Sequence, residues 1–203
     1  MSCSLVGSEM CIRDSSFTEA MISTFSAILA SPEFLFQCSQ PGKLDDFALA
    51  ERLAFFLGES MPDETLKKLA RDGLLRKRQN LERQVDRLIG KPDFDRFVKE
   101  FLNAWLKLDE INDTDPDREL YPEYAGDWWL VDSMVRESQL FFADLIVNNR
   151  SASGLIDSDY TFLDERLARH YGIDGLQGPV FKRTKLPPRS PYGGILTQAS
   201  VLK

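Results

Sequence analysis

Apolar residues recur at intervals of three and four along most of the chain, a pattern typical of amphipathic helices. The clearest example lies between residues 93 and 105, where large apolar side chains follow this spacing without interruption. Similar patterns predict further helices over about 20–29, 45–58, 63–70, 80–89, 127–148 and 161–171. The sequence therefore predicts a mainly α fold, a bundle of about seven helices.

The ends of these predicted helices carry residues that favour capping. Asp45 and Asn80 are placed to accept the first free backbone amides of their helices. Gly172 stands just past the predicted helix 161–171, where Ile173 can fold back on Leu167.

The predicted helix 127–148 carries apolar and charged residues on separate faces. Its inward positions are Val131, Met134, Val135, Phe141, Phe142 and Leu145. Its outward positions are Asp132, Arg136, Glu137 and Asp144.

Strand patterns are weak, and the stretch 179–184 is the one extended segment we expect. Glycines and prolines crowd the chain after Gly172, so we expect an irregular C-terminal segment. We place a domain boundary near Gly175, which separates a helical domain over 16–174 from the segment 175–203.

Charge and composition exclude several classes of protein. The 203 residues contain 25 Lys and Arg against 32 Asp and Glu, for a net charge of −7, which disfavours a nucleic-acid-binding protein. No apolar run approaches the roughly 20 residues that span a bilayer. The chain has one histidine and three cysteines, and it lacks CxxC, CxxCH, HExxH, GxSxG, GxGxxG and Walker motifs. We therefore expect no self-contained haem or zinc site.

The first fifteen residues differ from the rest of the chain. Residues 4–15, SLVGSEMCIRDS, resemble a translated sequencing-adapter tail that recurs at the ends of unrelated open reading frames from shotgun data. We expect 1–15 to be a disordered artefact, and the segment does not have the pattern of a signal peptide. Cys3 and Cys11 belong to it, which leaves Cys38 alone.

An acidic stretch follows residue 108 and suggests a cation site. Asp113, Asp115 and Asp117 have the alternate spacing that oxygen-ligated calcium favours. Pro116 lies between two of these candidate ligands, and Arg118 stands where an EF-hand loop needs glycine. A solvated acidic loop is therefore the preferred interpretation.

Candidate catalytic residues gather between 157 and 170. Asp157 and Asp159 could divide acid and base roles, with Tyr160 beside them. Glu165 and His170 follow on the predicted helix, and a lone histidine can act as a general base or as one metal ligand. Helix capping by this stretch and a structural role for His170 are the preferred alternatives.

Several stretches resemble one family of multidomain proteins. They are AILASPEFLFQ (27–37), LDDFALAERLAFFLGESMPDETL (44–66), FLNAWLKLDE (101–110), LIDSDYTFLDERLARHYGI (155–173) and YGGILTQASVL (192–202). They are similar to a domain of unknown function from planctomycete-type proteins that also carry c-type cytochrome domains. The last stretch resembles the opening of the adjoining domain, so we expect 175–203 to be the truncated start of that domain.

The resemblance implies an extracytoplasmic, periplasmic protein with haem c on neighbouring domains and no cofactor of its own. It implies that the partners are other domains of the same polypeptide, and it carries over no catalytic residue. Our first hypothesis is a helical scaffold or docking module that is not an enzyme on its own. The alternative is a catalytic or substrate-binding module of a haem-linked oxidoreductase or polymer-degrading enzyme, using Asp159, Tyr160 and His170.

Overall fold

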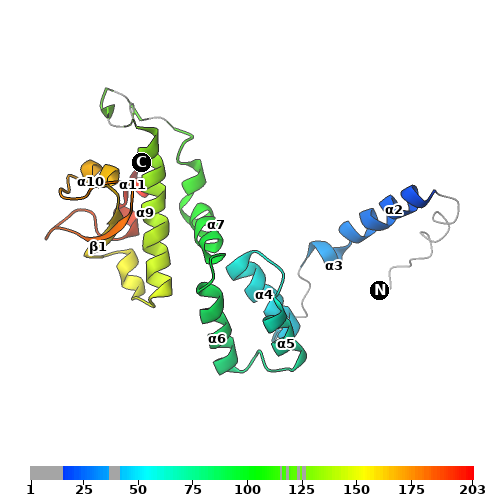
Figure 1. Ribbon diagram of the computed structural model, residues 1–203. Helices are drawn as coiled ribbons and strands as arrows, with labels where there is room; N and C mark the ends of the chain where they lie inside the picture. Colours follow the sequence, from blue (N-terminus) through cyan, green and yellow to red (C-terminus); the bar gives the residue numbers. More distant parts are fainter. Residues whose placement is uncertain (1–15, 37–41, 115, 118, 123, 125–126) are drawn as a thin grey trace.

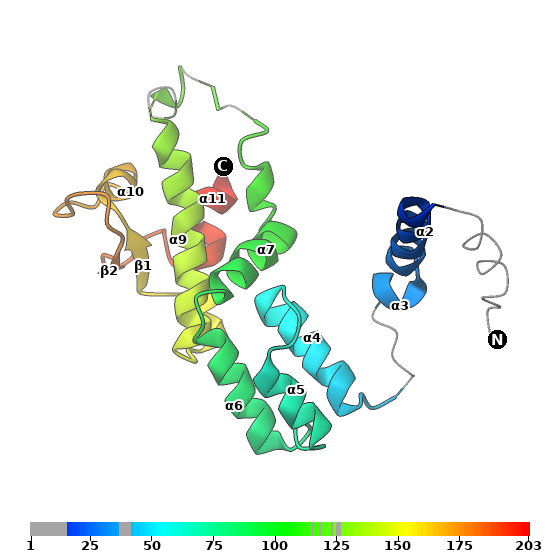
Figure 2. The ribbon, with the colours of Figure 1, turned by 45° about the vertical axis from the view of Figure 1, so that its right-hand side comes forward.

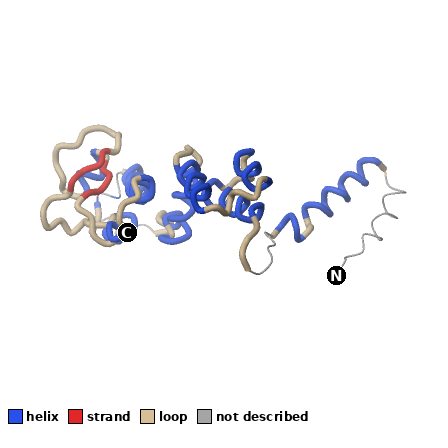
Figure 3. The backbone as a smooth tube through the Cα atoms, turned by 90° about the horizontal axis from the view of Figure 1, so that it is seen from below, coloured by secondary structure: helices blue, strands red, loops and turns tan. Residues whose placement is uncertain are grey.

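The computed structural model describes residues 16–36, 42–114, 116–117, 119–122, 124 and 127–203 (Figure 1). Helices make up most of this part of the chain, and two short strands pair near one end of the molecule (Figure 3). The predicted mainly α fold is thereby confirmed. No helix in the described ranges has the length and apolar character needed to cross a membrane.

Helices α2 (Phe17–Leu29) and α3 (Pro32–Leu35) form the N-terminal part of the described chain. Ser16 and Glu19 build a capping box at the start of α2, in which the Ser16 backbone amide donates to the Glu19 carboxylate over 2.9 Å. Helix α2 contains no buried residue. Both ribbon views show α2 and α3 apart from the other helices (Figures 1 and 2).

A helical group follows, made of α4 (Asp46–Gly58), α5 (Glu64–Arg71), α6 (Arg78–Ile89) and α7 (Phe94–Leu106), with a short 3-10 turn η2 (Leu108–Glu110). Asp45 caps α4 as predicted, since its carboxylate accepts the Ala48 amide over 2.8 Å. The predicted cap Asn80 is wrong, because α6 begins at Arg78. The Asn80 side chain instead donates to the Leu74 carbonyl over 2.9 Å.

Helix α9 (Trp128–Val147) stands between two hydrophobic clusters. Phe141, Phe142 and Leu145 pack into the first cluster with residues of α4, α5, α6 and α7. Leu130 and Met134 pack into the second cluster with residues from β1 onward. Both sides of α9 are therefore covered along much of its length (Figure 2).

The turn η3 (Ala152–Leu155) leads to a two-stranded antiparallel sheet of β1 (Tyr160–Leu163) and β2 (Lys182–Lys185), in which Tyr160 pairs with Lys185. Helix α10 (Glu165–His170) starts at its N-cap Asp164, whose carboxylate accepts the Leu167 amide over 2.8 Å. The prediction that this helix starts at Thr161 is wrong, because the aromatic and β-branched run Tyr160–Leu163 pairs with β2 instead. The predicted end is confirmed: Gly172 has φ +66°, and the Ile173 amide donates to the Ala168 carbonyl over 2.8 Å.

The chain closes with η4 (Ile195–Thr197) and α11 (Ala199–Leu202), which return to α9. Residues 192–203 are called the strap below. Its position beside α9 is visible in both ribbon views (Figures 1 and 2).

Candidate docking site on helix α9

The strap is anchored by apolar contacts at its first half. The Tyr192 ring stacks on Tyr171 with centroids 4.3 Å apart, and Ile195 is fully buried in the first cluster. Ala199 is buried in the second cluster. The strap therefore contributes side chains to both clusters that α9 separates.

Gly194 allows the strap to pass close to the turn before β1. Its φ is +95°, and a Cβ at this position would lie 2.5 Å from the Ile156 carbonyl oxygen and 2.7 Å from that of Leu155. No side chain fits between backbones this close, and the positive φ favours glycine as well. Gly194 is thus required where the strap passes the turn before β1.

Glu137 lies beneath the strap in the middle of α9. The prediction that it faces outward is wrong, because its exposed fraction is 0%. Its Oε1 accepts the Thr161 hydroxyl from β1, and its Oε2 accepts the Tyr171 hydroxyl from the end of α10 over 2.7 Å. No ion pair is found for Glu137 within the described chain.

The two hydroxyls that bind Glu137 also bind the strap. The Tyr171 oxygen accepts the Ala199 backbone amide over 2.7 Å, and the Thr161 oxygen accepts the Gln198 side-chain amide over 3.5 Å. Next to Glu137, the Ser138 hydroxyl lies 2.6 Å from the Gln198 Oε1 and 2.6 Å from the Ser200 hydroxyl. We call these six residues the polar network: Glu137, Ser138, Thr161, Tyr171, Gln198 and Ser200.

Burial sets the protonation of the polar network. Removal from water raises the pKa of Glu137 to about 7, although the Thr161 and Tyr171 hydroxyls favour the ionised form. Burial, together with the adjacent Glu137, also raises the pKa of the Tyr171 phenol, which therefore stays a hydrogen-bond donor. A carboxyl with this pKa changes charge near neutral pH.

One turn before Glu137, Ser133 makes a second buried polar contact between α9 and the elements that follow it. Its hydroxyl donates to the Asp164 Oδ2 over 2.8 Å, while the Asp164 Oδ1 caps α10. Among the residues described, no buried side-chain nitrogen or oxygen lacks a hydrogen-bond partner. Buried polar groups are costly unless paired, so this satisfied arrangement fixes how β1, α10 and the strap sit on α9.

Asp144 was also predicted to face outward, and its side chain is in fact mostly covered. The carboxylate accepts the Arg150 guanidinium over 2.7 Å and the Tyr160 hydroxyl over 2.8 Å. Burial opposes its ionisation, but the Arg150 and Tyr160 donors outweigh that effect and lower its pKa. Because α9 is packed on two sides, Glu137 and Asp144 face other elements, whereas Asp132 is exposed as predicted.

The acidic loop after α7 interacts with the last residue of the strap. The Lys203 ammonium donates to the Ile111 carbonyl and, over 3.0 Å, to the Thr114 carbonyl. The Asp117 carboxylate accepts the Glu119 and Leu120 backbone amides over 2.8 and 3.1 Å, so it organises a local turn. Asp113 is exposed, and Asp115 lies outside the described residues.

No group of three or more His, Cys, Asp or Glu in the described part of the chain is arranged to hold a metal ion. Asp113 and Asp117 therefore belong to no such group there. The strap's Lys203 places its ammonium group against the backbone carbonyls of this loop.

The candidate catalytic residues lie in different surroundings. Asp157 and Asp159 are exposed. Tyr160 is buried in the first cluster, where its hydroxyl donates to Asp144 and the Arg183 guanidinium carbon lies 3.8 Å from its ring centroid. His170 is half-buried near the second cluster, between the rings of Tyr124 and Tyr171 with centroids 5.9 and 5.6 Å away.

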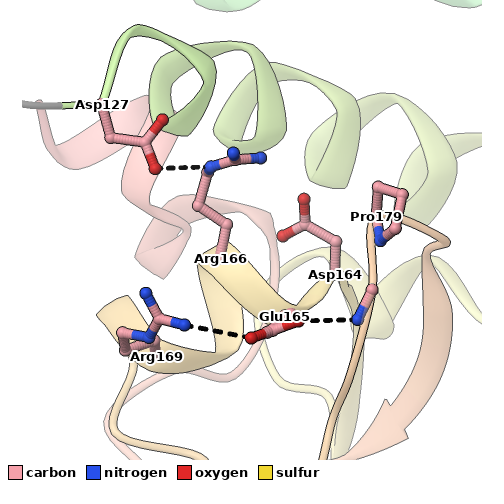
Figure 4. A pocket seen from close by; sticks show the side chains of 7 residues that line it. Asp127, Asp164, Glu165, Arg166, Arg169 and Pro179 are labelled. Carbon is pink, nitrogen blue, oxygen red and sulfur yellow. Dashed lines mark hydrogen bonds and ion pairs between the residues drawn. The ribbon is translucent and has the colours of Figure 1, made fainter.

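Glu165 lies on the wall of a separate cavity of about 240 Å³ beside α10 (Figure 4). Its carboxylate accepts the Gly178 amide over 2.7 Å and the Arg169 guanidinium over 3.0 Å. Asp127 and Arg166 form a further ion pair on the same wall. Four of the charged groups drawn in Figure 4 thus form two ion pairs, and the Glu165 bond to Gly178 ties the loop after α10 to that helix.

These features define a mainly helical protein in which the long helix α9 holds the strap through buried polar contacts. The chain belongs to the family described as protein of unknown function (DUF1592), which matches residues 44–173. The match covers α4 through α10 and does not include the strap. Neither the curated proteins nor the solved structures contain a match to the chain.

Sequence reasoning missed Glu137, although a signal for it was present. Leu130, Met134 and Phe141 are inward-facing, and Glu137 follows Met134 by three residues and precedes Phe141 by four. This spacing puts all of them on one helix face. The helical period therefore indicated a buried glutamate more strongly than its charge indicated exposure.

Proposed function

We propose that this chain is a helical docking module of a larger extracytoplasmic, cytochrome-c-associated protein. In this proposal haem c belongs to neighbouring domains, and the module has no cofactor or catalytic site of its own. Its partners are other domains of the same polypeptide. The part of the proposal that concerns location and cytochromes rests on the sequence resemblance alone.

One observation carries the docking role. The segment after the family match is held on α9 by a set of buried side chains, in which Tyr171 and Thr161 bind Glu137 on one side and the strap on the other. Buried hydrogen bonds of this kind specify one geometry, because a misplaced strap leaves polar groups unpaired.

The sequence of the strap supports an identity for what is docked. Residues 192–202 resemble the opening of the domain that adjoins this one in planctomycete-type proteins. The strap would then be the start of that neighbouring domain, and α9 would fix the position of the neighbour relative to the helical group. A module that orients its neighbours needs buried, geometry-specific contacts of this type.

The catalytic alternative lacks a comparable observation. Tyr160 contacts Asp144 and Arg183 in one cluster, whereas His170 contacts Tyr124 and Tyr171 near the other. The structure does not gather these residues in one cleft, so we keep docking as the proposed function.

A double-mutant cycle on Ser138 and Ser200 tests whether the strap is docked in solution. We expect Ser138→Ala and Ser200→Ala to be coupled by about 0.5–1.5 kcal/mol in the free energy of unfolding, because their hydroxyls form a buried hydrogen bond. Urea unfolding of the full chain measures this coupling. The exposed pair Ser151 and Ser153, with hydroxyls 2.7 Å apart, is the matched control and should show almost none. Equal coupling in the two pairs would remove the support for docking.

A further inference from the structure

The proposed docking depends on a carboxyl that makes no ion pair with any described residue. Glu137 is fully buried, and its partners among the described residues are two neutral hydroxyls. A buried carboxylate without a counter-ion is costly, whereas the neutral acid is tolerated. The strap therefore covers a carboxyl whose charged form costs more free energy to bury than its neutral form.

Asp144 shows that α9 can also hold a carboxylate in its charged form. It lies two turns after Glu137 and has the Arg150 guanidinium 2.7 Å away. Both carboxyls thus lie on α9, and what distinguishes them is that Asp144 has a neighbouring cation. The uncharged surroundings are therefore specific to the part of α9 beneath the strap and are not shared by the whole helix.

The groups that face Glu137 come from each element packed on this side of α9. Strand β1 contributes Thr161, and the end of α10 contributes Tyr171. The neutral side chains of Gln198 and Ser200 in the strap bind Thr161 and Ser138 next to Glu137. The nearby titratable groups form one further set. They are Tyr192 and His170, whose rings contact Tyr171, and Asp164, whose carboxylate is bound by Ser133 and the Leu167 amide.

We propose that ionisation of Glu137 releases the strap, so that docking of the adjoining segment is favoured in acid and weakened in alkali. This inference rests on the proposed docking function and adds its regulation. The proton leaves the carboxyl for solvent, and the resulting charge is hydrated most easily when the strap lifts away from Thr161 and Tyr171. Both hydroxyls contact the strap directly, so hydration of the carboxylate and loss of strap contacts occur together.

The direction follows from linkage. Burial raises the pKa of Glu137 to about 7 with the strap docked, against an ordinary value of 4.5 when the carboxyl is exposed to water. The docked form therefore binds the proton more tightly, and docking weakens as pH rises from about 5 through 7. The docking equilibrium should fall roughly 10- to 100-fold between about pH 5.5 and pH 8.5.

Hydrogen exchange of the full chain at pH 5.5 and 8.5, corrected for intrinsic rates, tests the proposal. Wild-type strap amides, including that of Ala199, should lose protection by this factor at the higher pH. Glu137→Gln should keep the strap equally protected at both values. Asp132→Asn, which removes an exposed carboxylate from the same helix, and His170→Gln should both retain the wild-type response.

The outcomes separate this proposal from the one it rests on. Strap amides that are protected equally at both pH values in the wild type would overturn the pH-dependent release and leave docking intact. A strap without protection at either pH would overturn docking itself. Loss of the pH response in His170→Gln, with its retention in Glu137→Gln, would assign the effect to the imidazole and contradict the proposal. Far-UV circular dichroism of each variant identifies any that fails to fold.

Discussion

At the scale of single residues, the most informative comparison is between Glu137 and Asp144. Both were predicted on the outer face of α9, and both are instead covered by elements that pack on it. Arg150 and Tyr160 lower the pKa of Asp144 against the effect of burial, whereas burial raises the pKa of Glu137 to about 7. The local partners, more than burial itself, decide which of the two carboxyls is charged.

Glu137 should make the stability of the whole fold depend on pH. Because its folded pKa of about 7 exceeds the ordinary 4.5, its stabilising contribution is complete below pH 4.5 and is lost as pH rises through 7. The loss should approach about 3 kcal/mol near pH 8.5. Urea unfolding at several pH values measures this loss as the difference in unfolding free energy between the wild type and Glu137→Gln. Parallel curves for the two proteins would contradict the raised pKa.

At the scale of secondary-structure elements, Asp63 connects two helices. Its carboxylate caps α5 by accepting the Leu66 amide over 3.1 Å. The same group accepts the Arg87 guanidinium over 2.6 Å and the Lys91 ammonium over 2.7 Å, at the end of α6 and just beyond it. One side chain thereby fixes the start of α5 against the end of α6, and the Arg87 hydrogen bond is the main cause of its lowered pKa.

Asp63→Asn should destabilise the fold by about 1–2 kcal/mol at pH 7, through a weaker cap and the loss of partly buried ion pairs. Since the pKa of Asp63 is lowered on folding, its contribution is present above pH 3.8 and is lost as pH falls further. Urea unfolding at pH 7 and pH 3 should therefore show a difference that shrinks in acid. Asp93→Asn is the control, because Asp93 makes no capping bond to α7 and should cost little. A similar cost for both variants would count against this account.

Helical periodicity predicted the elements that pack by an amphipathic face. Each expected helix has a counterpart, and the main errors lie at helix starts: at Arg78 rather than near Asn80, at Glu165 rather than Thr161, and at Phe17 rather than about residue 20. The second error has a clear physical cause: strand pairing of Tyr160–Leu163 with 182–185 joins residues about 20 positions apart, which no local pattern reports. The short helix α11 has four residues, too few for a period to be recognised.

At the scale of the whole molecule, the candidate site joins three distant parts of the sequence. Glu137 and Ser138 come from α9, Thr161 and Tyr171 from the elements after it, and Gln198 and Ser200 from the strap. The buried position of Glu137 was readable from its spacing to Met134 and Phe141. The partners of Glu137 could not be predicted from the sequence, because neutral Ser, Thr, Gln and Tyr residues form no motif until the fold brings them together.

The second glycine of YGGILTQASVL, Gly194, has a structural reason in the whole molecule. Gly194 passes so close to Ile156 that any side chain would collide with the carbonyl, whereas Gly175 has an equally unusual φ of +93° and open space around it. The two positions thus differ in contact with the turn before β1 while sharing the same backbone strain. Gly194 and Gly175 therefore provide a matched pair for testing whether the strap is docked on α9.

Hydrogen exchange of Gly194→Ala and Gly175→Ala in the full chain, at about pH 6, tests the central claim that the strap is docked on α9. The account predicts that Gly194→Ala loses amide protection at residues 198–202, that Gly175→Ala keeps it, and that both retain protection in α4–α7. Equal strap protection in the two variants would contradict the claim, as would an unprotected strap in the wild-type protein.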